Sequence, residues 1–176
     1  IPKARGLQSQ NLHPHQKGYL HLRLLDGHVL RYNGGHMTKI FLCASMNFYE
    51  ELVRIEGELI TRGFEVDIPV SSKTMKAKND FEVSHFKGVF TSEQKGKFIK
   101  ENFANIASCD AILVINNQKN GIDGYIGANV LMEIGLAFYL DKKIYIWNQY
   151  PNDSPYKEEL LAFNVQVITQ DLNKIT

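Results

Sequence analysis

Short and almost wholly apolar runs, alternating with helical patterns, place the strongest constraint on how this chain folds. Three of these runs are KIFLCAS at 39–45, AILVI at 111–115 and KIYIW at 143–147. Segments of strand length with so few charges are typical of parallel strands that helices cover on both faces. We therefore expect a parallel sheet in the middle of the fold, with helices packed against both of its sides.

The segments between the apolar runs have the patterns of helices. Asn47 with Glu50, and Thr91 with Gln94, have the spacing of a capping box at a helix start. Apolar residues at helical spacing follow each pair, and Gly63 stands where a left-handed residue ends the first helix. The remaining predicted elements are helices over 128–140 and 155–163 and strands over 64–70 and 165–168.

The order of these elements predicts the fold class. Strands and helices alternate along the chain, with one irregular insertion or lid over 71–90. We expect an α/β fold, a flavodoxin-like or Rossmann-like three-layer sandwich with a five-stranded parallel sheet in the order 2-1-3-4-5. Ligands of such sheets bind beyond the carboxyl ends of the strands where the order reverses. This rule places Ser45, the loop 116–127 and Asn148 around one crevice.

A change of charge near residue 36 divides the chain. Residues 1–36 hold five basic residues, one acidic residue and five of the six histidines, whereas 37–176 has a net charge of −3. We interpret 1–36 as a leader or tag-like segment, in which alternating leucines before Asp26 allow a small hairpin, and 37–176 as one domain. A basic arm for nucleic acid or metal is the less favoured alternative, because no Cys and His pair has zinc-site spacing.

Composition argues against several function classes. The apolar runs are too short to span a membrane, and the slightly acidic domain argues against nucleic acid as a partner. Cys43 and Cys109 lie in or beside apolar runs and are predicted to be buried thiols, which favours a cytoplasmic location. We expect no metal and no cofactor. A flavodoxin-like redox protein is disfavoured because 44–47 lacks the Ser/Thr-rich run of a flavin phosphate loop.

One carboxylate stands out in the helix predicted over 128–140. Glu133 is the only charged residue from Tyr125 to Phe138. It lies one turn after Asn129 on the same helix face, because residues i and i+4 align. Burial in an apolar wall of the crevice would raise the pKa of this carboxyl and strengthen it as a base or nucleophile. A salt bridge, or a place on the wet side of the helix, is the alternative for a single Glu.

The stretch around Glu133 resembles a known family. Gly127-Ala-Asn-Val-Leu-Met-Glu-Ile-Gly-Leu-Ala is similar to the Gly/Ser-rich turn and Glu-[Ile/Leu]-Gly-x-Ala helix of the nucleoside 2-deoxyribosyltransferase family. Its relatives, the 2′-deoxynucleoside 5′-phosphate N-hydrolases, share this element. Cys43-Ala44-Ser45, Cys109-Asp110-Ala111 and a Lys-Lys-Ile-Tyr strand agree with the family in order and spacing. The resemblance extends over roughly 37–172.

This resemblance implies cleavage or transfer at the N-glycosidic bond of a (deoxy)nucleoside or nucleotide. The family's matching glutamate attacks the anomeric carbon, so the resemblance assigns Glu133 as the nucleophile and Asp110 as a second catalytic residue. It further implies a small-molecule nucleoside or nucleotide as partner, and a homodimer or higher homo-oligomer. Whether water or a second base takes the sugar stays open. The candidate substrate-binding residues are Ser45, Asp123, Gly127 and Asn129.

Each assignment has a structural alternative. Asp110 equally suits a strand start beside a lysine, Asp123 suits a turn, and Asn129 suits an ordinary helix N-cap. Phe41 stands where the transferases often have a tyrosine that hydrogen-bonds the nucleophile, and a phenyl ring has no donor. The alternative function is therefore a non-catalytic nucleotide-binding module that uses the same crevice.

Overall fold

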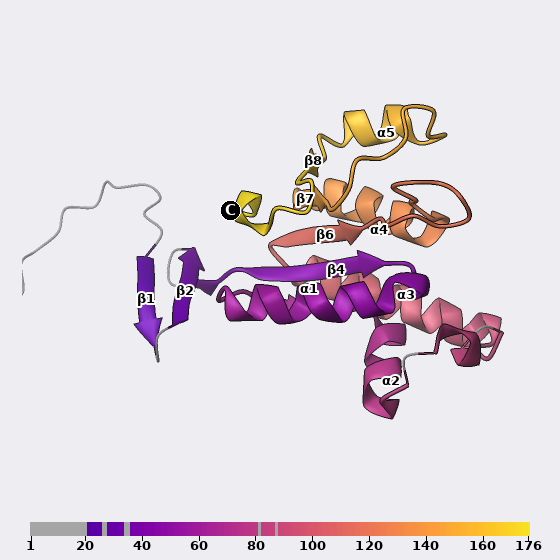
Figure 1. Cartoon of the computed structure of the whole chain (residues 1–176), viewed down its shortest axis with the longest axis horizontal. Coiled ribbons are helices and arrows are strands. Elements are labelled where there is room, and N and C mark those ends of the chain that lie inside the picture. Colours follow the sequence, from indigo (N-terminus) through magenta and orange to yellow (C-terminus); the bar gives the residue numbers. More distant parts are fainter. Residues whose placement is uncertain (1–20, 26–27, 34–35, 81, 87) are drawn as a thin grey trace, which may run out of the picture.

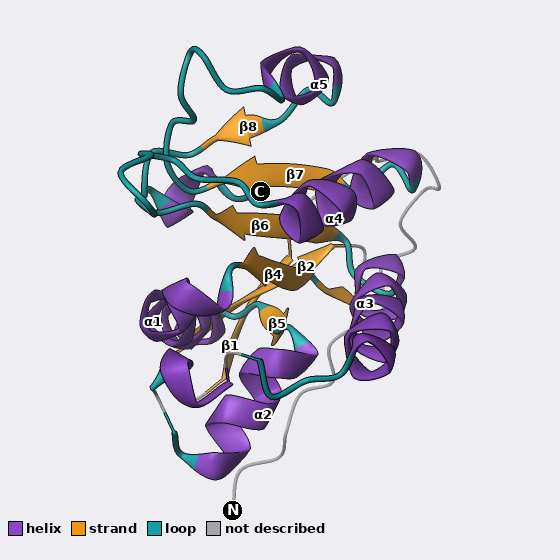
Figure 2. Cartoon of the chain, turned by 90° about the vertical axis from the view of Figure 1, so that its right-hand side faces the viewer, coloured by secondary structure: helices purple, strands orange, loops and turns teal. Residues whose placement is uncertain are grey.

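A parallel sheet forms the middle of the molecule, as predicted. The computed structural model describes residues 21–25, 28–33, 36–80, 82–86 and 88–176. Within them, a five-stranded, all-parallel sheet has the order β5-β4-β6-β7-β8, which is 2-1-3-4-5 in chain order. Figure 1 shows β4, β6, β7 and β8 side by side, and Figure 2 also shows β5 beside β4. The strands are β4 (Lys39–Ala44), β5 (Glu65–Asp67), β6 (Ala111–Ile115), β7 (Lys143–Ile146) and β8 (Gln166–Val167).

Helices cover both faces of this sheet, so the predicted three-layer α/β architecture is confirmed. Figure 2 shows α1 (Tyr49–Thr61) on one side of the strands and α3 (Ser92–Ala107) and α4 (Ala128–Tyr139) on the other. Leu160 of the short helix α5 (Lys157–Ala162) belongs to the same buried cluster as Val130, Ile134 and Ala137 of α4. Successive side chains of a strand point to opposite faces, and each face therefore has its own buried cluster.

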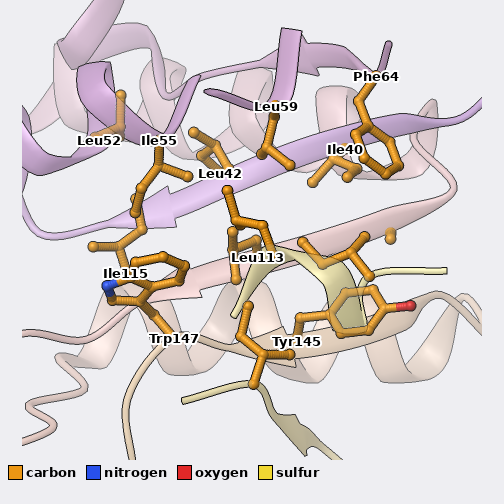
Figure 3. Close-up of a cluster of buried hydrophobic side chains, with 14 of the residues drawn as sticks. Ile40, Leu42, Leu52, Ile55, Leu59, Phe64, Leu113, Ile115, Tyr145 and Trp147 are labelled. Carbon is orange, nitrogen blue, oxygen red and sulfur yellow. The ribbon is translucent and has the colours of Figure 1, made fainter. Parts of the chain in front are cut away.

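The buried cluster beneath α1 shows why these residues form these elements. Leu52, Ile55 and Leu59 repeat at helical spacing and are fully buried. Figure 3 shows them over Ile40 and Leu42 of β4 and the side chains of β6. All five residues of β6 are buried, as expected for a central strand with helices on both faces.

The insertion over 71–90 contains a helix that its sequence pattern did not predict. After β5 the chain turns at Pro69, which has no N–H for a strand ladder, and α2 (Val70–Lys78) begins there. Ser72 and Met75, three residues apart, are buried, and Asn79 ends the helix in the left-handed region at φ 50°. Two inward-facing residues are too few to give a visible period. A short 3-10 turn, η2 (Val83–Phe86), follows.

Of the two predicted capping boxes, one is present and one is wrong. Thr91 and Gln94 cap α3 reciprocally. Asn47 is not the N-cap of α1, because it lies within a 3-10 turn, η1 (Met46–Phe48). Ser45 caps that turn and accepts the backbone N–H of Asn47 at 3.4 Å. The chain then enters α1 from that turn, and α1 has no side-chain cap. Gly63 has a φ of 83° just after α1, as predicted.

The backbone before the parallel sheet forms a small antiparallel sheet. The hairpin of β1 (His21–Leu25) and β2 (His28–Asn33) is confirmed, and β3 (His36–Met37) pairs with β2. Its turn residues lie outside the described ranges. A short 3-10 turn, η3 (Leu172–Lys174), lies near the other end of the chain. Of the helices in the described ranges, none has the length and apolar character to cross a bilayer.

Candidate active site

A cavity of about 480 Å³ opens beyond the carboxyl end of β4, where the strand order reverses. The residue after that strand, the start of α2, one face of α3 and the first turns of α4 line it. Ser45, Gly127, Asn129 and Glu133 are among the lining residues, so the structure brings four of the six predicted site residues together. A cavity of this volume suits a small-molecule ligand.

Glu133 is a buried carboxylate in the wall of this cavity. Its side chain is 6% exposed, and it lies on α4 among apolar residues of that helix. Burial raises the pKa of Glu133 to about 7, because a charged carboxylate loses its hydration there. Hydrogen bonds from Asn102 and Cys43 act in the opposite direction and favour the charged form. The result is a carboxyl that is about half ionised near neutral pH.

Asn102 fixes one oxygen of that carboxyl. Its Nδ2 donates to the Glu133 Oε1 at 2.9 Å, and its Oδ1 accepts the backbone N–H of Val70 at 3.1 Å. Because the amide oxygen is occupied by the first residue of α2, the NH₂ group must face Glu133. Asn102 thereby connects the insertion over 71–90 to the carboxylate on α4.

The second hydrogen-bond partner of Glu133 is Cys43, on β4. The thiol is fully buried, and burial, followed by the neighbouring Glu133, raises the pKa of Cys43 well above its ordinary value. It therefore stays a neutral S–H group, which can donate to a carboxylate. The resemblance places Phe41, which has no donor, where the transferases often have a tyrosine. In the structure, Cys43, two residues along the same strand face, supplies that donor.

Two lysines also line the cavity. Lys119, from the loop between β6 and α4, donates from Nζ to the Ser45 Oγ at 3.0 Å, and its Nζ lies 5.0 Å from the ring centroid of Tyr125. Lys95 reaches the cavity from the first turns of α3. Among the described lining residues, Glu133 is the one carboxylate. The walls therefore carry more positive than negative charge.

Asp110 is not near Glu133. It precedes β6, and its Oδ2 accepts the backbone N–H of Lys39 at 2.7 Å. The five residues of β6 separate it from the carboxyl edge of the sheet, about 16 Å at the rise of an extended strand. The residue thus lies at the opposite edge from the cavity, and its contact with Lys39 is that of a strand-start residue. The geometry corrects the expectation that Asp110 joins Glu133 in one site.

Asp123 does not line the cavity, and Asn129 lines it without capping the helix. Asp123 accepts a hydrogen bond from the Gln118 Nε2 at 2.7 Å within its own loop and lines neighbouring hollows rather than this cavity. Asn129 lines the cavity but is not the N-cap of α4, which is Gly127. A Cβ at Gly127 would lie 3.2 Å from the Tyr125 ring, so a glycine lets that ring pack against the helix start.

Sequence reasoning missed Asn102, Cys43 and Lys119 as site residues. Asn102 did carry a signal, since it is a polar residue on the otherwise apolar face formed by Phe98, Ile99 and Ile106. Cys43 looked like any buried thiol, and Lys119 looked like a loop lysine. Within the described ranges, no group of three or more His, Cys, Asp or Glu residues could hold a metal ion.

Similarity between this chain and known proteins is found among solved structures. No protein-family model matches the chain, and no curated protein matches it either. The structure of Clostridium botulinum CMP N-glycosidase, BcmB, matches 74% of this chain and 87% of that chain, at 19% identity and a TM-score of 0.46. A 2-deoxyribosyltransferase from Bacillus psychrosaccharolyticus matches 62% of this chain and 71% of its own, at 16% identity and a TM-score of 0.41. Both TM-scores lie below 0.5, so the inference of function rests on the cavity of this chain and on the sequence around Glu133.

Proposed function

We propose that this protein cleaves or transfers at the N-glycosidic bond of a nucleoside or nucleotide, with Glu133 as the nucleophile. The observation that carries the proposal is a single buried carboxylate in the wall of a ligand-sized cavity, held by Asn102 and Cys43. The resemblance of the stretch 127–137 to the nucleoside 2-deoxyribosyltransferase family supplies the reaction class.

The geometry suits this chemistry for a physical reason. Breaking a glycosidic bond builds positive charge on the sugar, and a fixed, poorly hydrated carboxylate stabilises that charge. A Glu133 oxygen forms a bond to the anomeric carbon while the bond to the base nitrogen breaks, and the base keeps the electron pair and takes up a proton. Water or a second base then displaces Glu133 and restores its carboxylate. Asn102 and Cys43 hold the attacking group in place.

The test is base release from a panel of common nucleosides and 5′-monophosphates, followed by chromatography. Glu133→Ala and Glu133→Gln are expected to lower the rate at least about a thousandfold while the fold is retained. Glu101→Gln is the matched control, because Glu101 is an exposed carboxylate on α3, and it should keep the wild-type rate. Since the attacking group must be ionised, the rate should rise with pH up to about pH 7. Base release by Glu133→Gln at the wild-type rate, or none by the wild type, contradicts the proposal.

One observation favours a second candidate, a nucleotide-binding module without turnover. Among the described residues that line the cavity, no second carboxyl is present to protonate the departing base. A binding module needs the cavity but not an acid. A nucleotide that raises the thermal unfolding midpoint without any release of base would favour this candidate over the enzyme.

A further inference from the structure

The two lysines of the cavity are placed where a ligand would meet them. Both line the same cavity as Glu133, one from α3 and one from the loop between β6 and α4. In the described residues, neither Lys95 nor Lys119 is within ion-pair distance of a carboxylate. Lys73, Lys76 and Lys97, which lie elsewhere on α2 and α3, each have such a partner.

Lys119 has the more defined surroundings of the two. Lys119 is half-buried, and its ammonium group lies between the Ser45 hydroxyl and the Tyr125 ring. Neither neighbour neutralises its charge, because a hydroxyl and an aromatic ring are both uncharged. An ammonium group partly removed from water gains most from an anion that enters the cavity beside it.

Ser45 has a hydroxyl hydrogen that can donate to the same kind of ligand. Its Oγ already accepts hydrogen bonds from Lys119 and from the backbone N–H of Asn47, so its own hydrogen is the group left to donate. The first turn of α4, including Ala128 and Asn129, lines the cavity as well, and its backbone N–H groups and helix dipole favour negative charge. Glu133 is the one carboxylate among the described lining residues, so the two lysines outnumber it.

From this arrangement we infer that Lys119 and Ser45 bind a phosphate group of the ligand, so that the preferred substrate is a nucleoside monophosphate. As a statement about substrate the inference rests on the proposed function, but phosphate recognition itself does not need turnover. On binding, the Lys119 ammonium and the Ser45 hydroxyl both donate to phosphate oxygens, while the sugar lies toward Glu133. Lys119 is then the residue that separates phosphorylated from unphosphorylated ligands.

The experiment measures binding, in Glu133→Gln full-length protein so that ligands stay intact. Calorimetry compares the four common deoxynucleosides with their 5′-monophosphates. With Lys119 present, at least one monophosphate should bind about tenfold or more tightly than its nucleoside. Adding Lys119→Met should remove most of that preference and leave nucleoside affinity within about twofold. Lys119→Arg should keep it, because a guanidinium also binds phosphate.

The matched control is Lys97→Met, which removes the same charge from an exposed lysine on α3 that is paired with Glu93 at 2.9 Å. It should leave the preference unchanged. Equal binding of nucleosides and monophosphates, or a preference that survives both Lys119→Met and Lys119→Gln, overturns the inference. Base release by the wild type without a phosphate preference refutes the inference but not the proposed function. A phosphate preference without base release refutes the function and keeps the inference.

Discussion

At the scale of a single residue, the burial of Glu133 that suits its proposed role also lowers the stability of the fold when the carboxyl is ionised. Its pKa is about 7 in the folded protein because burial removes water from the charged carboxylate. The unfolded chain holds the same group near its ordinary pKa of 4.5. Between these two values the folded state binds more protons than the unfolded state, so stability falls as the pH rises. Above pH 7 the ionised Glu133 destabilises the fold by about 3 kcal/mol.

Replacing Glu133 by Gln should therefore stabilise the protein at high pH. The amide resembles the neutral carboxyl and carries no charge, so the free energy of unfolding should rise by up to about 3 kcal/mol at pH 8. The gain should shrink as the pH falls through 7 and disappear only below pH 4.5, where both states hold a neutral carboxyl. Urea unfolding of the variant and the wild type at pH 5 and pH 8 measures the difference. A gain that is the same at both pH values would contradict the burial of Glu133 as its cause.

At the scale of elements, two loops at the carboxyl edge of the sheet are joined closely. Asn116, fully buried after β6, donates from Nδ2 to the Asn148 carbonyl at 2.9 Å and accepts the Asn148 N–H at 2.7 Å. Gly124 has a φ of 64°, and a Cβ there would lie 2.1 Å from the Gln149 carbonyl oxygen. The loop that carries Lys119 is thus held against the chain that follows β7.

Gly124→Ala should separate these two loops. The left-handed φ and the clash with a backbone oxygen together should cost about 3 kcal/mol of unfolding free energy. Gly121→Ala, in the same loop, is the matched control, because its φ is 79° but a Cβ there meets nothing within 4 Å. That variant should lose only about 1 kcal/mol. Equal losses in the two variants, measured by urea unfolding, would show that the close approach at Gly124 is unimportant.

At the scale of the whole molecule, the two large buried clusters lie on opposite faces of the parallel sheet. In the described part of the chain their members run from Ile40 to Ile175, and the last residues, Leu172 and Ile175, pack in the cluster under α1. These clusters supply most of the apolar surface that stabilises the fold. We propose that residues 40–175 are sufficient to form both of them.

A chain that starts at Met37 should therefore fold with the stability of the full chain. Its thermal unfolding should stay a single transition, with a midpoint within a few degrees of the full-length value. Differential scanning calorimetry of the two chains makes the comparison. A drop of ten degrees or more would mean that residues 1–36 belong to the folded domain rather than to a leader or tag-like segment.

Patterns within single segments were enough to predict the α/β class and the order of the strands. Apolar runs report burial on both faces, and alternation with helices leaves few ways to connect parallel strands. The sequence also placed Glu133, because a single charge in an apolar helix next to the reversal of strand order is visible in one segment. Tertiary structure alone decided which residues surround that carboxylate. Cys43, Asn102 and Lys119 come from three other elements, and no pattern within one segment reports a contact between segments. The fold also places Asp110 far from the cavity, because the two ends of a strand lie at opposite edges of the sheet.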